Sequence, residues 1–140
     1  HNFPYPSPTI RKMCKFYEHK KYKEKILSKC QYLMKLTKEN NPWGRDIIES
    51  MYLRLGIIAT GNQSPFIKNH FNGYLFKNYK SKKIANCISA LSKNKKLITK
   101  HQYNSKVLSD RLFDNKIISS QFESFWLSIS KKSYKKKHSV

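Results

Sequence analysis

The sequence predicts an α/β fold with a short parallel sheet and a helical carboxyl-terminal third. Two observations support this. The runs 31–36 and 56–60 are apolar and short, as the buried strands of a parallel sheet are. Stretches with apolar residues at helical spacing follow these runs, and they fill the chain from residue 81 onward. This order is that of half a doubly wound, Rossmann-like domain.

Three parts are expected along the 140 residues. Residues 1–10 contain three of the five prolines and should be an extended lead-in. Residues 11–130 should fold, and the lysine-rich 131–140 should be a disordered basic tail. Parallel strands are expected near 13–17, 31–36, 56–60 and 73–76. A doubly wound sheet usually has about six strands, so the chain is expected to be the carboxyl-terminal part of a longer domain.

Helices are expected between and after these strands. A helix should begin after Gly44, with Asp46 in its first turn, and should stop at Gly56. We expect further helices at 20–30, within 61–72, from 81, over 94–113 and over 115–130. The apolar residues of the first of these helices should cover the sheet: Ile48, Met51, Tyr52 and Leu55. Those of the last should face a core: Ile117, Phe122, Phe125, Trp126 and Ile129.

The net charge of +21 favours polyanionic partners such as nucleic acid, anionic membrane or nucleotide phosphates. The alternative interpretation is that lysine simply replaces other polar residues on solvated faces. Cys14, Cys30 and Cys87 are far apart and no pair has CxxC spacing, so no metal site is expected. No run of 18 apolar residues is present that would span a membrane.

The stretch 37–61 differs from the rest of this basic chain because it holds three of the eight acidic residues and three of the four glycines. Its first part should be a loop at the carboxyl end of a strand, where open α/β sheets bind ligands. The helix after Gly44 would direct unpaired N–H groups at that ligand, and Gly44 would let it approach the backbone. Glu49 could accept two hydrogen bonds from adjacent ribose hydroxyls. The alternatives are that Asp46 only complements the helix dipole and that Trp43 only packs.

The segment "ENNPWGRDIIESMYLRLGIIATG", residues 39–61, resembles the donor-binding signature of the retaining glycosyltransferases of the GT-B fold, the large fourth family of nucleotide-sugar-dependent enzymes. "FIKNHFNGYLF", residues 66–76, is similar to the family's next element. The resemblance extends more weakly from about Lys15 to Ile129. It implies the carboxyl-terminal, donor-binding part of a GT-B enzyme.

The resemblance also implies roles for individual residues. Glu49 would hold the ribose hydroxyls of the nucleotide. Backbone N–H groups at Trp43, Gly44 and Arg45 would bind the sugar. Gly61 and Asn62 would lie near the donor.

Three departures from the family pattern affect this assignment. The family has a Glu eight residues before the helix Glu, and Asn41 occupies that position here, with Glu39 as the nearest carboxylate. Either Glu39 or Asn41 would therefore take the catalytic, sugar-contacting role. Arg54 replaces a residue that is usually small. The family's basic pair that grips the diphosphate lies before the residues of this chain.

The sequence thus predicts the donor-binding portion of a retaining glycosyltransferase, with a nucleotide-sugar as substrate and no cofactor or metal. The acceptor, a glycan, lipid or small molecule, would be bound by an amino-terminal domain, so the 140 residues alone should be inactive. The enzyme should be cytoplasmic, with peripheral contact to an anionic membrane. Two alternatives stay open: a basic nucleic-acid-binding module, whose lysines alternate with aromatics in "KFYEHKKYKEK", and an inactive glycosyltransferase remnant.

Overall fold

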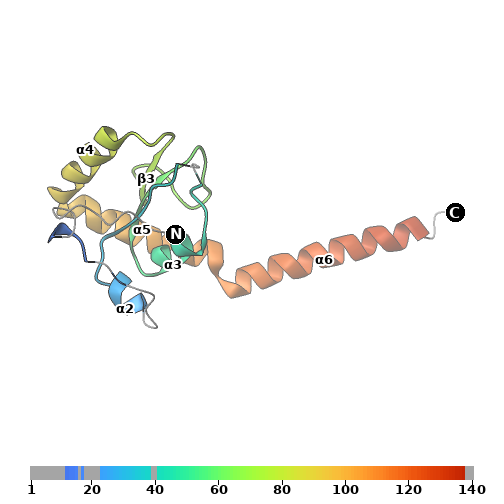
Figure 1. Ribbon diagram of the computed structural model, residues 1–140. Helices are drawn as coiled ribbons and strands as arrows, with labels where there is room; N and C mark the ends of the chain where they lie inside the picture. The colour runs from blue at the N-terminus through green and yellow to red at the C-terminus, as the bar shows by residue number, and fades with distance from the viewer. Residues whose placement is uncertain (1–11, 16, 18–22, 39–40, 138–140) are drawn as a thin grey trace.

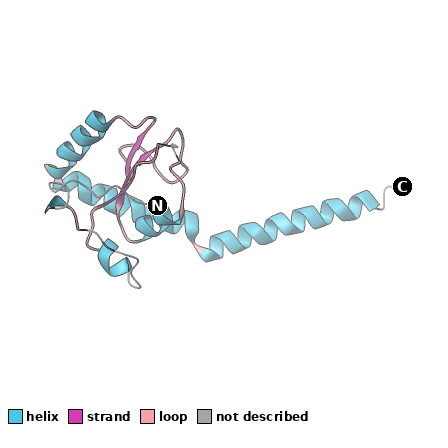
Figure 2. Ribbon diagram, in the orientation of Figure 1, coloured by secondary structure: helices cyan, strands magenta, loops and turns pink. Residues whose placement is uncertain are grey.

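The computed structural model covers residues 1–140 and describes 12–15, 17, 23–38 and 41–137, the last seven of these by their backbone alone. A sheet of three parallel strands lies at the centre of the body (Figure 2). Its strands, in spatial order, are β1 (Tyr32–Lys35), β2 (Gly56–Thr60) and β3 (Gly73–Phe76). The helices are α2 (Lys23–Leu27), α3 (Arg45–Tyr52), α4 (Ser81–Ser92), α5 (Lys95–Phe113) and α6 (Asn115–Lys137). The predicted fold class is confirmed.

The core forms on one face of β2, the strand that is buried along its whole length. Because side chains alternate along a strand, Ile57 and Ala59 share this face. They pack with Ile47 and Met51 of α3 and with Leu108 of α5. Helix α3 therefore buries Ile47 and Met51, whereas the predicted Ile48 and Tyr52 are only half-buried and exposed, respectively.

The opposite face of the sheet is only partly covered. Ile58 of β2 lines an apolar pocket of about 110 Å³ together with Ile88 and Leu91 of α4. Met34 of β1 lines the same pocket and is 47% exposed. Within the described residues, β1 pairs only with β2, so the other edge of β1 is open.

Helix α3 ends in a Schellman motif, two residues earlier than the sequence predicts. The N–H of Leu55 donates to the carbonyl of Ser50 (2.9 Å) and the N–H of Arg54 donates to the carbonyl of Met51 (3.0 Å). The motif requires a left-handed residue, usually glycine. Arg54 takes this conformation, with φ 63°. The expected stop at Gly56 is thus wrong, since Gly56 is the first residue of β2.

Two further expectations about secondary structure are wrong, and one lies outside the described residues. In the described part of 13–17 there is no strand: Met13 is helical, and it and Tyr17 are exposed. Without burial, their apolar side chains do not stabilise a strand. The segment 61–72 contains bends and turns in place of the expected short helix. The expected lead-in over 1–10 is outside the described residues.

Helix α6 projects away from the rest of the described structure (Figure 1). The apolar residues expected to face a core are exposed, including Phe122, Phe125 and Trp126 at 58–61%. Helix α6 continues to Lys137, through the first seven residues of the expected disordered tail over 131–140, and residues 138–140 lie outside the described residues. The 3.6-residue period predicted the helix correctly, but periodicity alone cannot identify the surface that covers its apolar face.

Candidate functional site

The carboxyl ends of β1 and β2 are joined by one hydroxyl group. The N–H of Thr37 donates to the Oγ1 of Thr60 (3.0 Å), and this hydroxyl donates to the carbonyl of Thr37 (2.7 Å). Thr60 is fully buried. A buried backbone group without a partner is costly, so this pair of bonds fixes where the loop after β1 begins.

The loop is then shaped by two bonds around Asn41. Its N–H donates to the Oγ1 of Thr37 (3.2 Å), and its Oδ1 accepts from the N–H of Trp43 (3.2 Å). The Trp43 ring meets Phe66 edge to face, with centroids 5.0 Å apart. The Trp43 ring therefore packs and its N–H is bonded within the loop, and its role toward a sugar stays a prediction. Glu39 lies outside the described residues.

The amino end of α3 begins at Gly44, whose φ is 145°. No side chain caps this end, and the N–H groups of Arg45 and Asp46 have no acceptor among the described residues. Lys35 approaches from β1, where its Nζ donates to the carbonyl of Trp43 and to the Oδ1 of Asp46 (2.9 Å). A Cβ on Gly44 would lie 2.5 Å from that Nζ. The backbone conformation therefore favours glycine here, whereas the flexible Lys35 side chain could move away from a Cβ.

Gly61 follows the last residue of β2 and lies on the other side of the site from Gly44. Its N–H donates to the carbonyl of Phe76 at the end of β3 (2.8 Å). A Cβ at Gly61 would lie 2.4 Å from the Cγ of Pro42, so the loop rests directly on this glycine. Asn62 follows as an exposed residue. The structure thus brings Asn41, Gly44 and Gly61 to the same edge of the sheet, as predicted.

Glu49 lies one turn into α3, and two cations already bind its carboxylate. Its Oε2 accepts from the Nζ of Lys23 in α2 (2.6 Å), and its Oε1 accepts from the Nε of Arg45 (2.6 Å). Its side chain is 26% exposed and lines a largely apolar pocket of about 280 Å³ between α2, α3 and α5. The hydrogen bond from Lys23, assisted by Arg45, outweighs burial and lowers the pKa of Glu49. The group is therefore ionised at neutral pH.

A polar pair, a half-buried tyrosine and a buried histidine, joins the start of β1 to α5. The Tyr32 hydroxyl and the Nδ1 of His101 are 2.8 Å apart, and the Nε2 of His101 has no partner among the described residues. Burial lowers the pKa of His101. Burial, followed by the nearby Tyr74, raises the pKa of Tyr32. Both groups are therefore neutral at pH 7, which suits a structural role.

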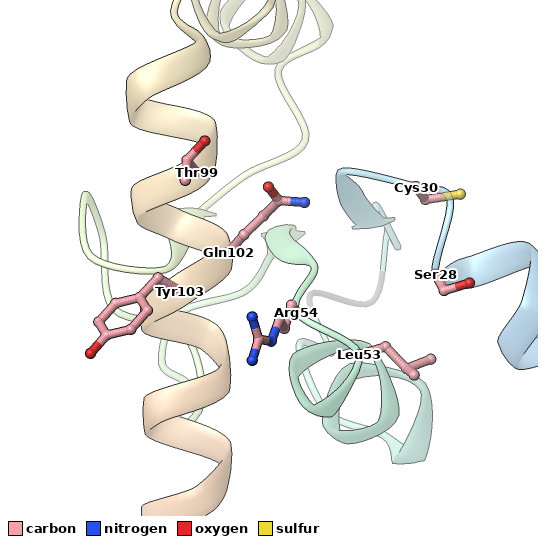
Figure 3. Close-up of a pocket in the computed structure, with 7 residues that line it drawn as sticks. All are labelled: Ser28, Cys30, Leu53, Arg54, Thr99, Gln102 and Tyr103. Carbon is pink, nitrogen blue, oxygen red and sulfur yellow. The ribbon is translucent and has the colours of Figure 1, made fainter.

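A further pocket, of about 340 Å³, lies at the amino ends of β1 and β2 (Figure 3). Gly44 and Gly61 lie at the carboxyl ends of the strands, on the other edge of the sheet. Figure 3 shows the Arg54 side chain between the end of α3 and helix α5. The pocket lining is Ser28, Cys30, Leu53, Arg54, Thr99, Gln102 and Tyr103. None of the predicted site residues contributes to it.

Sequence reasoning missed the residues that hold the loop in place, namely Thr37, Thr60 and Lys35. A signal for the two threonines was present, because a hydroxyl at the end of a buried strand must find a partner. Lys35 carried no signal among so many lysines.

No protein-family model and no curated protein matches the sequence. Three solved structures of Anabaena Alr3699/HepE are similar to the chain: its complex with UDP (TM-score 0.66), with UDP-glucose (0.64) and with UDP and glucose (0.65). Each is 21% identical to this chain, and each match covers 74% of this chain and 29% of the other. The chain therefore spans less than a third of the length of these neighbours. The likeness agrees with the fold class described above.

Proposed function

We propose that the chain is the donor-binding portion of a retaining, nucleotide-sugar-dependent glycosyltransferase. The observation that carries this proposal is the meeting of Asn41, Gly44 and Gly61 at the carboxyl edge of the sheet, beside an uncapped helix end. The complexes of HepE with UDP and UDP-glucose support the choice of ligand class. The proposal includes an acceptor, a glycan, lipid or small molecule, that an amino-terminal domain binds.

The helix end supplies the contacts to the transferred sugar or to a phosphate. The N–H groups of Arg45 and Asp46 are unpaired among the described residues, and the helix dipole adds positive potential at this end. Gly44 lets the backbone take the conformation that exposes these N–H groups, and Gly61 lets Pro42 of the loop pack directly against the end of β2. Asn62 is exposed beside them.

Glu49 is proposed to bind the two ribose hydroxyls. Its lowered pKa keeps it in the ionised, acceptor-only form that this role needs. An ionised carboxylate has about four lone-pair sites, and the two bonds from Lys23 and Arg45 occupy two of them. The carboxylate can thus accept hydroxyl hydrogen bonds while it keeps both cations.

Asn41 is proposed to contact the transferred sugar, with Glu39 as the alternative. The Oδ1 of Asn41 is used by Trp43, which leaves its amide NH₂ as a donor to a sugar hydroxyl. A neutral amide does not stabilise positive charge at the anomeric carbon. The proposal includes no metal or cofactor.

The test is an NMR titration of the isotope-labelled 140-residue chain with UDP-glucose. We expect the largest shifts at the amides of Gly44, Arg45, Gly61 and Asn62. Shifts confined to other elements, or no binding, would contradict the proposal. The nucleic-acid-binding module would be favoured by two results together. The chain would bind single-stranded RNA more tightly than UDP-glucose, and its affinity for the RNA would fall by about 10³-fold or more between 50 and 200 mM salt.

Two variants then test the ribose assignment. Glu49→Gln keeps size and helix propensity but weakens both hydroxyl bonds. Since hydrogen bonds to a charged group contribute about 1.5–3 kcal/mol each, affinity should fall on the order of 10²-fold. Asp46→Asn, the matched control on the same helix, should change affinity little. The opposite result would show that the ribose carboxylate is Asp46.

A further inference from the structure

The pocket of about 340 Å³ that contains Arg54, here called the Arg54 pocket, lies apart from the proposed donor site (Figure 3). It lies at the amino ends of β1 and β2, whereas the donor site lies at their carboxyl ends. Its walls come from the connection between α2 and β1, the end of α3 and the first half of α5. Its volume is within the range of small-molecule pockets, about 300–1,000 Å³.

The guanidinium of Arg54 has no protein partner in the described part of the chain. Arg54 is also the one charged residue among those that line the pocket. The carboxylates that form ion pairs among the described residues, Asp46, Glu49 and Asp110, bind other cations. The N–H groups of Arg54 are therefore available to a ligand. A guanidinium is planar and binds the oxygens of a phosphate or a carboxylate in pairs.

The backbone at Arg54 is strained in a way that ending α3 does not require. Its φ is 63°, the left-handed conformation of the Schellman motif. Glycine would take this conformation without strain and would end the helix equally well. Strained residues of this kind concentrate at ligand-binding sites. The strain is thus explained if a cationic side chain is needed at this position.

The uncharged polar groups of the pocket match hydroxyl groups. Gln102 is half-buried, and Figure 3 shows its side chain extending from α5 toward the connection between α2 and β1, with Arg54 nearby. Its carboxamide has no partner among the described residues and offers both donors and an acceptor. The Thr99 hydroxyl donates to the carbonyl of Lys95 (3.1 Å), so its oxygen is still able to accept. A ligand that carries hydroxyls beside an anionic group satisfies all three side chains.

The lining of the Arg54 pocket disfavours its burial under another part of the protein. Five of its seven residues are polar or charged. A segment that covered them with apolar side chains would leave a buried guanidinium without a partner, which is costly. Lys29 and Lys100, next in sequence to lining residues, are exposed and add positive potential. Such a potential attracts small anions.

We propose that the Arg54 pocket binds a small phosphate monoester that carries hydroxyl groups, such as a sugar phosphate. The guanidinium of Arg54 binds the phosphate oxygens, and Gln102 and Thr99 bind the hydroxyls. The pocket shares no lining residue with the proposed donor site, so its ligand does not compete with a nucleotide-sugar. The inference goes beyond the proposed function and does not depend on it.

The test is an NMR titration of the isotope-labelled 140-residue chain with glucose 6-phosphate, with inorganic phosphate and with glucose. We expect shifts at the amides of Leu53, Arg54 and Gln102, with tighter binding of glucose 6-phosphate than of inorganic phosphate and no binding of glucose. Absence of these shifts, or shifts spread over the amides of exposed lysines, would overturn the proposal. Equal affinity for inorganic phosphate and glucose 6-phosphate would overturn it too, and would show an adventitious ion only.

Three variants assign the two parts of the ligand. Arg54→Gln keeps the Cβ but removes the charge, so affinity for glucose 6-phosphate should fall by about tenfold or more. Arg111→Gln makes the same charge change at an exposed arginine near the end of α5 and should bind as the parent does. Equal loss in both would show that general charge, not the pocket, binds the anion. Gln102→Leu should weaken binding of glucose 6-phosphate and leave that of inorganic phosphate unchanged. Loss of both would contradict the assignment of Gln102 to the hydroxyls.

Discussion

The two edges of the small sheet differ in which residues take positive φ and in whether buried polar groups have partners. At the carboxyl edge the positions with positive φ are glycines, Gly44 and Gly61. The hydroxyl of Thr60 forms hydrogen bonds with the backbone N–H and carbonyl of Thr37 in the loop that it faces. At the amino edge Arg54 takes a left-handed conformation, and His101 keeps a buried nitrogen without a partner among the described residues. Local sequence and structure thus agree at the proposed site, whereas at the opposite edge they agree at Gly73 and conflict at Arg54 and His101. Substitutions of Gly44 or Gly61 should therefore lower the free energy of unfolding, whereas a substitution of Arg54 should raise it.

The largest effect is expected from Gly61→Ala. Its Cβ would lie 2.4 Å from the Cγ and 2.5 Å from the Cδ of Pro42, at a φ of 159°. Overpacking and backbone strain together should lower the free energy of unfolding by about 2–4 kcal/mol, measured by urea denaturation. Pro42→Ala removes both ring atoms, so the double variant should recover part of the loss. No recovery would show that the conformation of Gly61, and not its contact with Pro42, matters most.

The next effect tests the amino edge through pH. Burial lowers the pKa of His101 and outweighs the backbone of His70, which raises it, and the charges of His70 and Lys100 add to the lowering. The unfolded chain therefore binds a proton that the folded chain does not. The free energy of unfolding should not depend on this group above about pH 6.5. It should decrease as the pH falls from there toward the folded-state pKa, by at most about 1.4 kcal/mol per pH unit. Urea denaturation between neutral and mildly acidic pH measures this slope.

Two variants assign the pH slope to one residue. His101→Gln should remove most of it, because the titrating group is gone. His70→Gln, at an exposed histidine, should keep it. If His70→Gln removes the slope and His101→Gln keeps it, the pair with Tyr32 is not the source.

A smaller effect is expected at Lys35, which ties the loop to α3. Lys35→Met leaves the Trp43 carbonyl and Asp46 without their bonds from Nζ. The loss should be about 1–2 kcal/mol, measured by urea denaturation. Lys38→Met, at an exposed lysine of the same loop, is the control and should change stability little. An equal loss in both would mean that lysine charge in general, not this bond, stabilises the edge.

The sequence correctly predicted the helices and strands that depend on a local pattern of residues. The apolar run of β2 and the period of α3, α4 and α5 are such cases, and so is the placing of the loop after β1 at the carboxyl edge. Apart from the stop expected at Gly56 and the helix expected within 61–72, the errors concern which surface covers an element. The period of α6 could not show that its apolar face stays exposed, and the charge of Glu49 could not show that Lys23 of α2 would reach it. The roles of Glu49 and Asn41 toward a donor stay predictions.

The smallest expected effect, of opposite sign, is at Arg54. Arg54→Gly relieves the left-handed strain at φ 63°, which for a residue with a Cβ costs roughly 1–2 kcal/mol. It also removes a cation near the end of α3, where the helix dipole makes a cation favourable by about 0.3–1 kcal/mol. Strain is the larger of the two, so the free energy of unfolding should rise by about 0.5–1 kcal/mol. Arg54→Ala keeps the Cβ and should give no gain, which separates strain from relief of charge repulsion in so basic a chain. Lys93→Gly is the matched control, since Lys93 ends α4 with φ −92° and has no such strain to lose. A gain for Arg54→Ala equal to that for Arg54→Gly would mean that charge, and not conformation, distinguishes the amino edge from the carboxyl edge.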